Sequence, residues 1–211
     1  MTIQNILPDP YHLITPSGND AGTGQTPGPG FASVSLSSNQ PIMRDRTNSG
    51  RVVSRVSAYH KWEIDIKYNP MTKAEFDPVF GFLLEKQGTL KPFFVSLPQY
   101  RDQGITDKTA SAAAAGSTTI VCDNITNIVV GALFTITDTD SAHTKAYMVN
   151  RVVNNTSITI TPGLAKAIST SAVLDFTDPT IKVIQSGDTQ QYSLNTENLY
   201  SFSLKLEEVS H

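Results

Sequence analysis

Cysteine is almost absent from this chain of 211 residues, which contains a single one, Cys122. One cysteine excludes a disulfide within the chain, so the fold cannot depend on covalent cross-links. The residue ends the short pattern Thr118–Cys122, which is typical of a strand. We therefore interpret Cys122 as a small buried side chain and not as a nucleophile.

The sequence also lacks an excess of positive charge and long apolar runs. Its 16 Lys and Arg residues against 19 Asp and Glu residues give a formal net charge of -3, whereas a general nucleic-acid binder needs a clustered basic face. No apolar run approaches the roughly 20 residues of a membrane helix, and no signal-peptide pattern opens the chain. We expect a soluble protein made in a reducing cytoplasm, without a membrane partner.

Recognisable catalytic and cofactor motifs are missing as well. Gly22–Pro27 begins like a dinucleotide fingerprint, but proline replaces the third glycine. Asp138–Ser141 lacks the glycine and glutamate of a calcium loop, so we interpret it as a polar hairpin tip. The histidines show no metal-ligand spacing; they are His12, His60, His143 and His211.

These absences predict a protein that is not an enzyme and that has no cofactor and no metal site. A Ser-His-Asp site that assembles in space stays open, because its members need not be close in sequence. A hydrolase would further need carboxylates that converge in a cleft, and Asp138 and Asp140 lie in the predicted polar tip.

Alternation of apolar and polar residues predicts long β-strands in the first half of the sequence and again near its C-terminal end. In Trp62–Tyr68 and Tyr200–Leu206 every second residue is apolar, which indicates antiparallel strands with one buried and one wet face. Phe31–Leu36 and Phe93–Leu97 are further strand candidates. The strands and the helix described next predict a core of Trp62, Ile64, Ile66, Tyr68, Phe80, Leu83, Phe94, Phe202 and Leu204.

One amphipathic helix is predicted between these strands. Thr72 and Glu75 have the spacing of a capping box, and Gly88 is a natural C-terminal stop. Apolar residues between them follow helical spacing. Pro78 lies inside this stretch, so we expect the helix to start later or to kink there. The helix should cover one face of the sheet.

A group of short strands interrupts the long ones. Short strands with an Asn154–Asn155 turn are typical of a small barrel or sandwich. The expected fold is mainly β (α+β): an antiparallel β-sandwich or barrel with one flanking helix and an inserted small β-barrel module. We predict an extended N-terminal arm over residues 1–30, a discontinuous β body over residues 31–104 and 177–211, and an inserted module over residues 105–176. The five strand candidates are Thr118–Val121, Leu133–Thr137, Ala146–Val153, Ser157–Thr161 and Ala172–Phe176.

Basic charge is concentrated locally in Arg44, Arg46, Arg51 and Arg55, with Asp45 among them. One interpretation is a solvated loop and strand face. The other is a patch that pairs with an acidic edge of a neighbouring subunit. Isolated surface pairs contribute about 0–1 kcal/mol each, but a repeated ring of such pairs fixes orientation. The N-terminal arm and the loop Gln40–Gly50 are further candidates for contacts between subunits.

Two sets of motifs resemble tail proteins of long-tailed bacteriophages, in particular distal tail proteins and minor tail proteins of the tail tip or baseplate hub. In the body these motifs are His60–Ile66, Asn69–Glu75 and Phe94–Pro98. In the insertion they are Ala115–Ile120, Gly131–Ile136, Ala146–Val149 and Ile158–Leu164. The resemblance covers about residues 51–206.

The resemblance implies a tail-tube-like β body that assembles as a homo-oligomeric ring, usually a hexamer, at the distal end of the tail tube. The ring would join the tail-tube protein to a baseplate hub or tail-tip protein. The inserted module would point outward, where it could hold fibres or contact the host surface. DNA would pass through the lumen only as cargo, and the protein would belong to the virion tail after assembly in the host bacterial cytoplasm.

Two other functions stay open from the sequence. A glycan-binding or receptor-binding module of a tail needs a concave site with exposed aromatic residues. In the insertion, Phe134, Tyr147 and Phe176 all lie at strand positions that favour the core. A tail-tube subunit is the other alternative, although such proteins seldom need so large an insertion.

Overall fold

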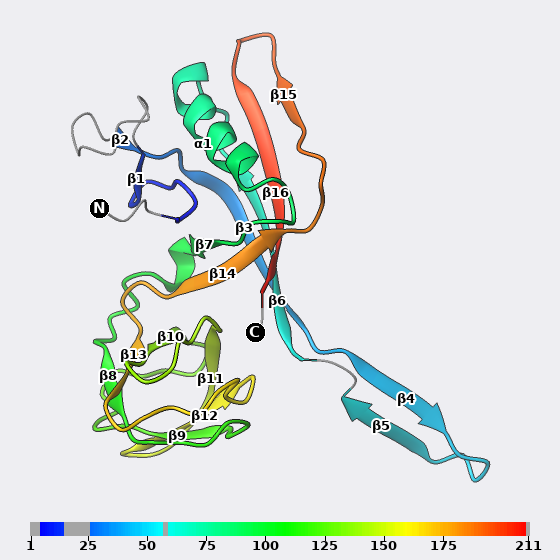
Figure 1. The fold of residues 1–211 in the computed structure, drawn as a ribbon, viewed down its shortest axis with the longest axis vertical. Helices are drawn as coiled ribbons and strands as arrows, with labels where there is room; N and C mark the ends of the chain where they lie inside the picture. The colour runs from blue at the N-terminus through cyan, green and yellow to red at the C-terminus, as the bar shows by residue number, and fades with distance from the viewer. Residues whose placement is uncertain (1–4, 15–25, 57–58, 210–211) are drawn as a thin grey trace.

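The computed structural model describes residues 5–14, 26–56 and 59–209 (Figure 1). The described chain is mainly β with one α-helix, α1 (Lys73–Glu85), and a 3-10 turn at Pro98–Tyr100, which confirms the predicted fold class. Its strands are β1 (Leu13–Ile14), β2 (Thr26–Pro27), β3 (Phe31–Asn39), β4 (Ile42–Arg46), β5 (Val52–Val56), β6 (Lys61–Tyr68), β7 (Phe93–Ser96), β8 (Lys108–Ala110), β9 (Thr119–Val121), β10 (Leu133–Thr137), β11 (Tyr147–Asn154), β12 (Ser157–Thr161), β13 (Ala172–Asp175), β14 (Thr180–Gln185), β15 (Tyr192–Leu194) and β16 (Tyr200–Glu208).

An antiparallel sheet in the order β3-β6-β16-β14-β7 forms the body, and β15 pairs with the first part of β16. Side chains alternate across it as the two-residue period requires. On β6 the apolar residues are buried, while Asp65 and Lys67 face solvent. The register Lys205↔Asp65 places polar residues of β16 on the same wet face.

Most predicted core residues are buried in one apolar cluster between this sheet and α1. The fully or nearly buried ones are Trp62, Ile64, Ile66, Tyr68, Leu83, Phe202 and Leu204. Phe80 is half-buried and packs against the cluster. Phe94 requires a correction, because it is half-buried while Phe93 is fully buried. The pleat of β7 turns Phe93 and Val95 toward the core and Phe94 away from it.

The helix α1 begins where its capping box predicts. The Thr72 backbone N–H and hydroxyl both donate to Glu75 Oε2 at 2.8 Å, which satisfies a polar group at the helix start. Pro78 does not delay the start, since the helix runs through it from Lys73 to Glu85. Its buried face, formed by Phe76, Val79 and Leu83, packs on the sheet.

The inserted strands form a second sheet in the order β8-β13-β10-β11-β12-β9. It closes on itself, because the Ser111 N–H donates to the Val121 carbonyl at 2.8 Å and the Asp123 N–H to the Thr109 carbonyl at 2.9 Å. Closure removes the exposed edges of a small sheet. The barrel has six strands and not five, since the short polar strand β8 gave no apolar pattern.

The barrel encloses its own apolar core, in which Phe134, Tyr147 and Phe176 are fully buried. Their rings are in contact, with centroids 5.7 Å apart for Phe134 and Tyr147 and 5.0 Å apart for Phe134 and Phe176. Cys122 belongs to this core, and burial raises the pKa of its thiol to about 11. The thiol is therefore protonated at neutral pH and unsuited to nucleophilic chemistry.

Adjacent leucines of α1 test the assigned orientation of the helix. Leu83 is fully buried, whereas Leu84 is 54% exposed. We expect Leu83→Ala to lower the free energy of unfolding by about 2–5 kcal/mol, because truncation leaves a cavity. Leu84→Ala should change it by no more than about 0.5 kcal/mol. Urea unfolding followed by the fluorescence of Trp62 measures both, and equal losses would contradict the orientation.

Candidate functional site: the projecting hairpin and the anchored module

A two-stranded hairpin of β4 and β5 projects away from the body (Figure 1). Every residue of both strands is exposed. An isolated two-stranded hairpin is marginally stable in water. Its apolar side chains are 45–65% exposed, and clustered exposed apolar residues are typical of interaction surfaces; they are Ile42, Met43, Val52, Val53 and Val56.

The hairpin carries all four arginines of the predicted basic patch, but it divides them between two faces. Arg44 and Arg46 share one face, because residues on alternate positions of a strand point the same way. Arg55 lies on the other face, opposite Met43, with 3.6 Å between its Nη2 and the sulfur. Arg51 follows the turn, where its carbonyl accepts the Thr47 N–H at 3.0 Å.

The face with two arginines is here called the basic face of the hairpin. Cross-strand register brings together Ile42 and Val56, Arg44 and Ser54, and Arg46 and Val52. The opposite face holds Asp45 and Arg55, so their charges offset each other there. The segment expected to be a loop at residues 40–50 is thus largely strand β4 with its turn, and the basic face is its cationic side.

The edges of the body sheet are not equivalent. Residues 5–7 cover the edge of β7, where the Leu7 N–H donates to the Phe94 carbonyl and the Phe94 N–H to the Asn5 carbonyl, each at 2.8 Å. Leu7 is fully buried, so this part of the predicted arm packs on its own chain. Residues 1–4 and 15–25 of the arm lie outside the described residues. Among the described strands, β3 pairs on one side only, with β6.

A buried ion pair holds the inserted module against the body. Lys145 of the module contacts Glu208 at the end of β16, and both are almost fully buried. The Lys145 amine also donates to the His60 carbonyl at 2.7 Å. Burial raises the pKa of Glu208, although the charge of Lys145 and several hydrogen bonds act in the opposite direction. The two charges stay buried because each satisfies the other.

Glu208 and Trp62 complete this junction with hydrogen bonds to the backbone. Glu208 accepts the Ala146 N–H at 3.0 Å and the Trp62 N–H at 3.2 Å. The Trp62 indole N–H donates to the Ala146 carbonyl at 3.0 Å. Sequence patterns gave no signal for this cluster, because its members come from three distant segments.

A second polar cluster surrounds Arg101, where the chain leaves the body. Its guanidinium donates to Asp9 at 2.8 Å, to Ser96 at 2.8 Å and to Asp178 at 3.1 Å. His12 contacts Asp9 at 3.0 Å and Asp178 at 3.3 Å. Burial alone would raise the pKa of Asp9, but hydrogen bonds from His12 and Arg101 hold it below its ordinary value. This cluster connects the N-terminal segment to the two places where the chain passes between the body and the inserted module.

The two histidines of the described chain that contact a serine do not complete a catalytic triad. Ser38 lies 2.8 Å from His60 Nε2, but the buried Nδ1 of His60 has no partner. Ser141 lies 2.8 Å and Asp138 4.0 Å from His143, but both contact the same ring nitrogen, Nε2. The buried Nδ1 has no partner, whereas a triad needs base and orienter on opposite nitrogens. Asp138 instead accepts the Ser169 hydroxyl and N–H, which lowers the pKa of Asp138 to about 2. Asp138 therefore fixes the loop that contains Ser169, in addition to lying in the polar tip that the sequence predicted.

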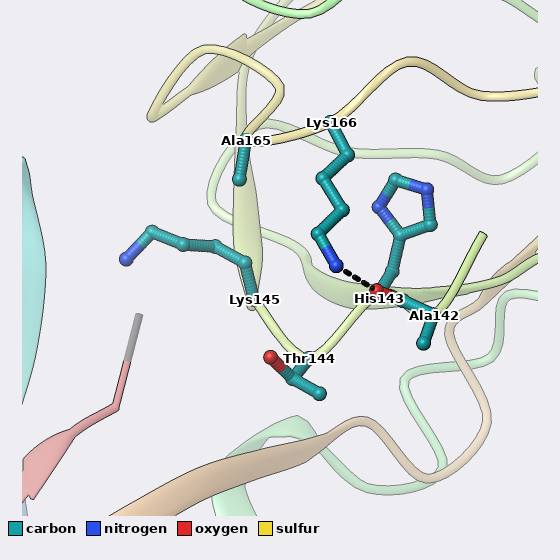
Figure 2. Close-up of a pocket in the computed structure, with 6 residues that line it drawn as sticks. All are labelled: Ala142, His143, Thr144, Lys145, Ala165 and Lys166. Carbon is teal, nitrogen blue, oxygen red and sulfur yellow. Dashed lines mark hydrogen bonds between the residues drawn. The ribbon is translucent and has the colours of Figure 1, made fainter. Parts of the chain in front are cut away.

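The cavity lined by His143 offers little room for chemistry. It has a volume of about 10 Å³, and Lys166 donates to the Ala142 carbonyl at its rim while Lys145 points away (Figure 2). That volume holds about one water molecule. A larger hollow of about 330 Å³ lies between Gln190, Phe202 and the end of β14. Within the described residues, no three metal-ligating side chains converge, and no helix has the length and apolar content to cross a membrane.

The ion pair at the junction predicts an asymmetric response to mutation. We expect Glu208→Gln to lower the free energy of unfolding by about 3–5 kcal/mol, since it leaves the charge of Lys145 buried and unpaired. The double variant Lys145→Met/Glu208→Leu should recover most of that loss because no buried charge remains. Urea unfolding measures both variants. A double variant as unstable as the single one would show that the backbone bonds, and not the charge pair, stabilise the junction.

Buried His60 predicts loss of stability in mild acid. Burial, with Lys145 nearby, lowers the pKa of His60 from 6.5 to about 4. The unfolded chain therefore binds this proton more readily, so stability is full above pH 6.5 and falls toward pH 4, by up to about 3 kcal/mol. His60→Phe should flatten this part of the profile of unfolding free energy against pH. An unchanged slope would assign the loss to other groups, such as His143, whose pKa burial also lowers.

Comparison with known proteins agrees with this geometry. The family model for the N-terminal part of the A domain of distal tail protein pb9 matches residues 7–100. These residues include α1, the hairpin and the strands from β1 to β7. The distal tail protein pb9 of Escherichia phage T5 is 31% identical over 215 aligned residues, which cover 96% of this chain and 98% of that protein. The chain therefore belongs to the distal tail protein family of bacteriophages.

Proposed function

We propose that this distal tail protein assembles into a closed ring of identical copies, six in number, at the far end of the tail tube. The ring joins the tail-tube protein to a baseplate hub or tail-tip protein. The observation that carries the proposal is the β4–β5 hairpin, which buries none of its residues on its own chain. A projecting element with exposed valines, isoleucine and arginines needs a partner in the assembled state.

Closed rings use head-to-tail contacts, in which one patch of each copy meets a different patch of the next. A projecting arm suits this kind of contact because it extends past the body that carries it (Figure 1). The free edge of β3 gives a second surface for contact, since an unpaired edge strand tends to pair with another chain. Charge pairs made by the arginines then fix the orientation of neighbouring copies more than they strengthen the binding between them.

The three parts of the chain have separate roles in this proposal. The body, over residues 31–104 and 177–211, forms the ring wall. The module, over residues 105–176, is carried outward as a closed barrel with its own core, available to fibres or the host surface. The N-terminal residues 1–30 contribute to the assembly surface beyond the part packed on β7.

The wet face of the body sheet suits a lumen through which DNA passes as cargo. Acidic and basic side chains offset one another on it, and serines fill one strand. A wall without strong positive charge does not retain phosphates. Its outward residues are Ser33, Ser35 and Ser37 on β3, Glu63, Asp65 and Lys67 on β6, and Ser203, Lys205 and Glu207 on β16.

A structural role fits the module better than glycan binding. Its aromatic side chains Phe134, Tyr147 and Phe176 are fully buried in the barrel core. They cannot provide the exposed stacking surface that sugar rings require.

Light scattering and negative-stain images test the ring and the role of the hairpin. We expect the wild-type chain to form rings with a central hole, in solution or on isolated tail tubes. Val52→Asp/Val56→Asp should weaken assembly by about tenfold or more, because it places two charges on a face that a neighbour covers. Both residues are exposed in the single chain, so its folding should be unchanged.

Val153→Asp in the module is the matched control, since Val153 is also exposed but lies far from the hairpin in the chain. We expect it to assemble like the wild type. If the hairpin variant assembles equally well, the hairpin is not a contact between subunits. A wild-type chain that closes no ring even on tail tubes would overturn the ring itself.

A further inference from the structure

The surface along α1 and β15 is a second exposed apolar area, at the opposite end of the body from the hairpin (Figure 1). Tyr192 of β15 contacts both Phe76 and Phe80 of α1, with ring centroids 5.0 Å and 5.5 Å apart. Leu194 and Tyr192 are each 52% exposed. Leu84 of α1 is similarly exposed. We call this strip, from Phe80 and Leu84 to Tyr192 and Leu194, the seam.

The seam is open along its length and hollow at one end. Among the described strands, β15 pairs only with β16, so its outer edge has no partner. The hollow of about 330 Å³ adjoins the seam through Gln191 and Phe202, and Phe202 pairs with Tyr192 across the two strands. The seam therefore offers an apolar strip, a strand edge and a recess for a side chain of a partner.

Gly81 makes a notch in the helix beside the seam. Asp77, Gly81 and Leu84 share one stripe of α1, because residues three and four apart are neighbours on a helix. A methyl group built on Gly81 meets no atom within 4 Å. Since glycine weakens a helix interior, its presence at an open position is consistent with a neighbour that approaches the backbone closely.

The charges of the seam and of the hairpin are opposite. The helix and its C-cap carry Lys73 and Lys86 against three acidic residues, of which Asp77 pairs with Lys73 at 2.6 Å and Glu85 with Lys86 at 3.4 Å. The turn between β15 and β16 adds Glu197. The acidic residues of the helix are Glu75, Asp77 and Glu85. The hairpin and its turn carry four arginines and one aspartate. Opposite charges at the rim of an apolar contact increase the association rate and fix the orientation of the partners.

We propose that the seam of each copy receives the basic face of the hairpin of the next copy. The inference rests on the proposed ring and identifies the surface that meets the hairpin. Ile42, Val52 and Val56 lie against Tyr192, Leu194 and Leu84, while Arg44 and Arg46 lie toward the acidic residues. The hairpin and the seam lie at opposite ends of one chain, so the contact forms between copies and repeats round the ring.

Cysteine cross-linking between two variants tests this pairing. Ser54→Cys places a thiol at the middle of the basic face, and Gly81→Cys places one in the notch of the seam. The native Cys122 is buried with a raised thiol pKa, so it stays unreactive. We expect mild oxidation of the mixed variants to give a covalent dimer that contains one S54C and one G81C chain, whereas either variant alone gives little.

Val53→Cys is the matched control, because Val53 lies on the opposite face of the hairpin from Ser54. We expect it to cross-link with G81C much more slowly than S54C does. Dimers of S54C with itself would indicate hairpin-to-hairpin contact and overturn the proposal. Rings in electron micrographs without any S54C–G81C product would overturn the seam as the acceptor and leave the ring intact.

Gly81→Gln provides an independent measurement. The added side chain meets open space in the single chain, so the free energy of unfolding should stay equal or rise. It should fill the notch and weaken ring assembly by about tenfold or more. Ala112→Gln, at an exposed position of the module, is the control and should assemble like the wild type. Normal assembly of G81Q would contradict the proposed contact.

Discussion

The pairing of β7 with β14 is the constraint on which the rest of the architecture depends. Ser96 and Thr180 face each other across this pair although a whole barrel lies between them in the chain. The body sheet is therefore continuous across β7 and β14, as it would be if a short turn joined the two strands. Any compact module fits between them if its ends meet, because the cost of closing a loop grows slowly with its length.

This arrangement explains why the two polar clusters occur where they do. Arg101, Ser96 and Asp178 surround the place where the chain leaves the body and returns. Lys145 and Glu208 lie on the other side of the contact, where the last strand of the body meets the barrel. Charged groups without partners are costly to bury, so the module docks well in only one orientation. Leu133 and Ala146 of the barrel also belong to the apolar cluster of the body, so the junction combines these charged groups with apolar packing.

Local patterns in the sequence were sufficient for the elements that depend on local chemistry. The alternation in β6 and β16 and the capping box of α1 predicted the strands, the helix start and most of the core. Whether Phe93 or Phe94 is buried could not be predicted in the same way. In a strand of four residues with two adjacent aromatics, the alternation does not show which residues face the core. The burial of Lys145 and Glu208 was equally hidden, because it depends on partners far away in sequence. The arginine cluster was found, but its division between two faces follows from the hairpin register, which the sequence alone did not define.

The covered edge of β7 also affects how the chain behaves before assembly. Residues 5–7 occupy that edge as an added parallel strand, with Leu7 inserted into the core. The edge of β7 is thereby closed to other chains, while the outer edges of β3 and β15 have no partner among the described strands. Covering an edge removes one of the routes by which edge strands pair from copy to copy and lead to fibrous aggregates. Before assembly, other chains can therefore pair with this sheet at the edges of β3 and β15 but not at the edge of β7.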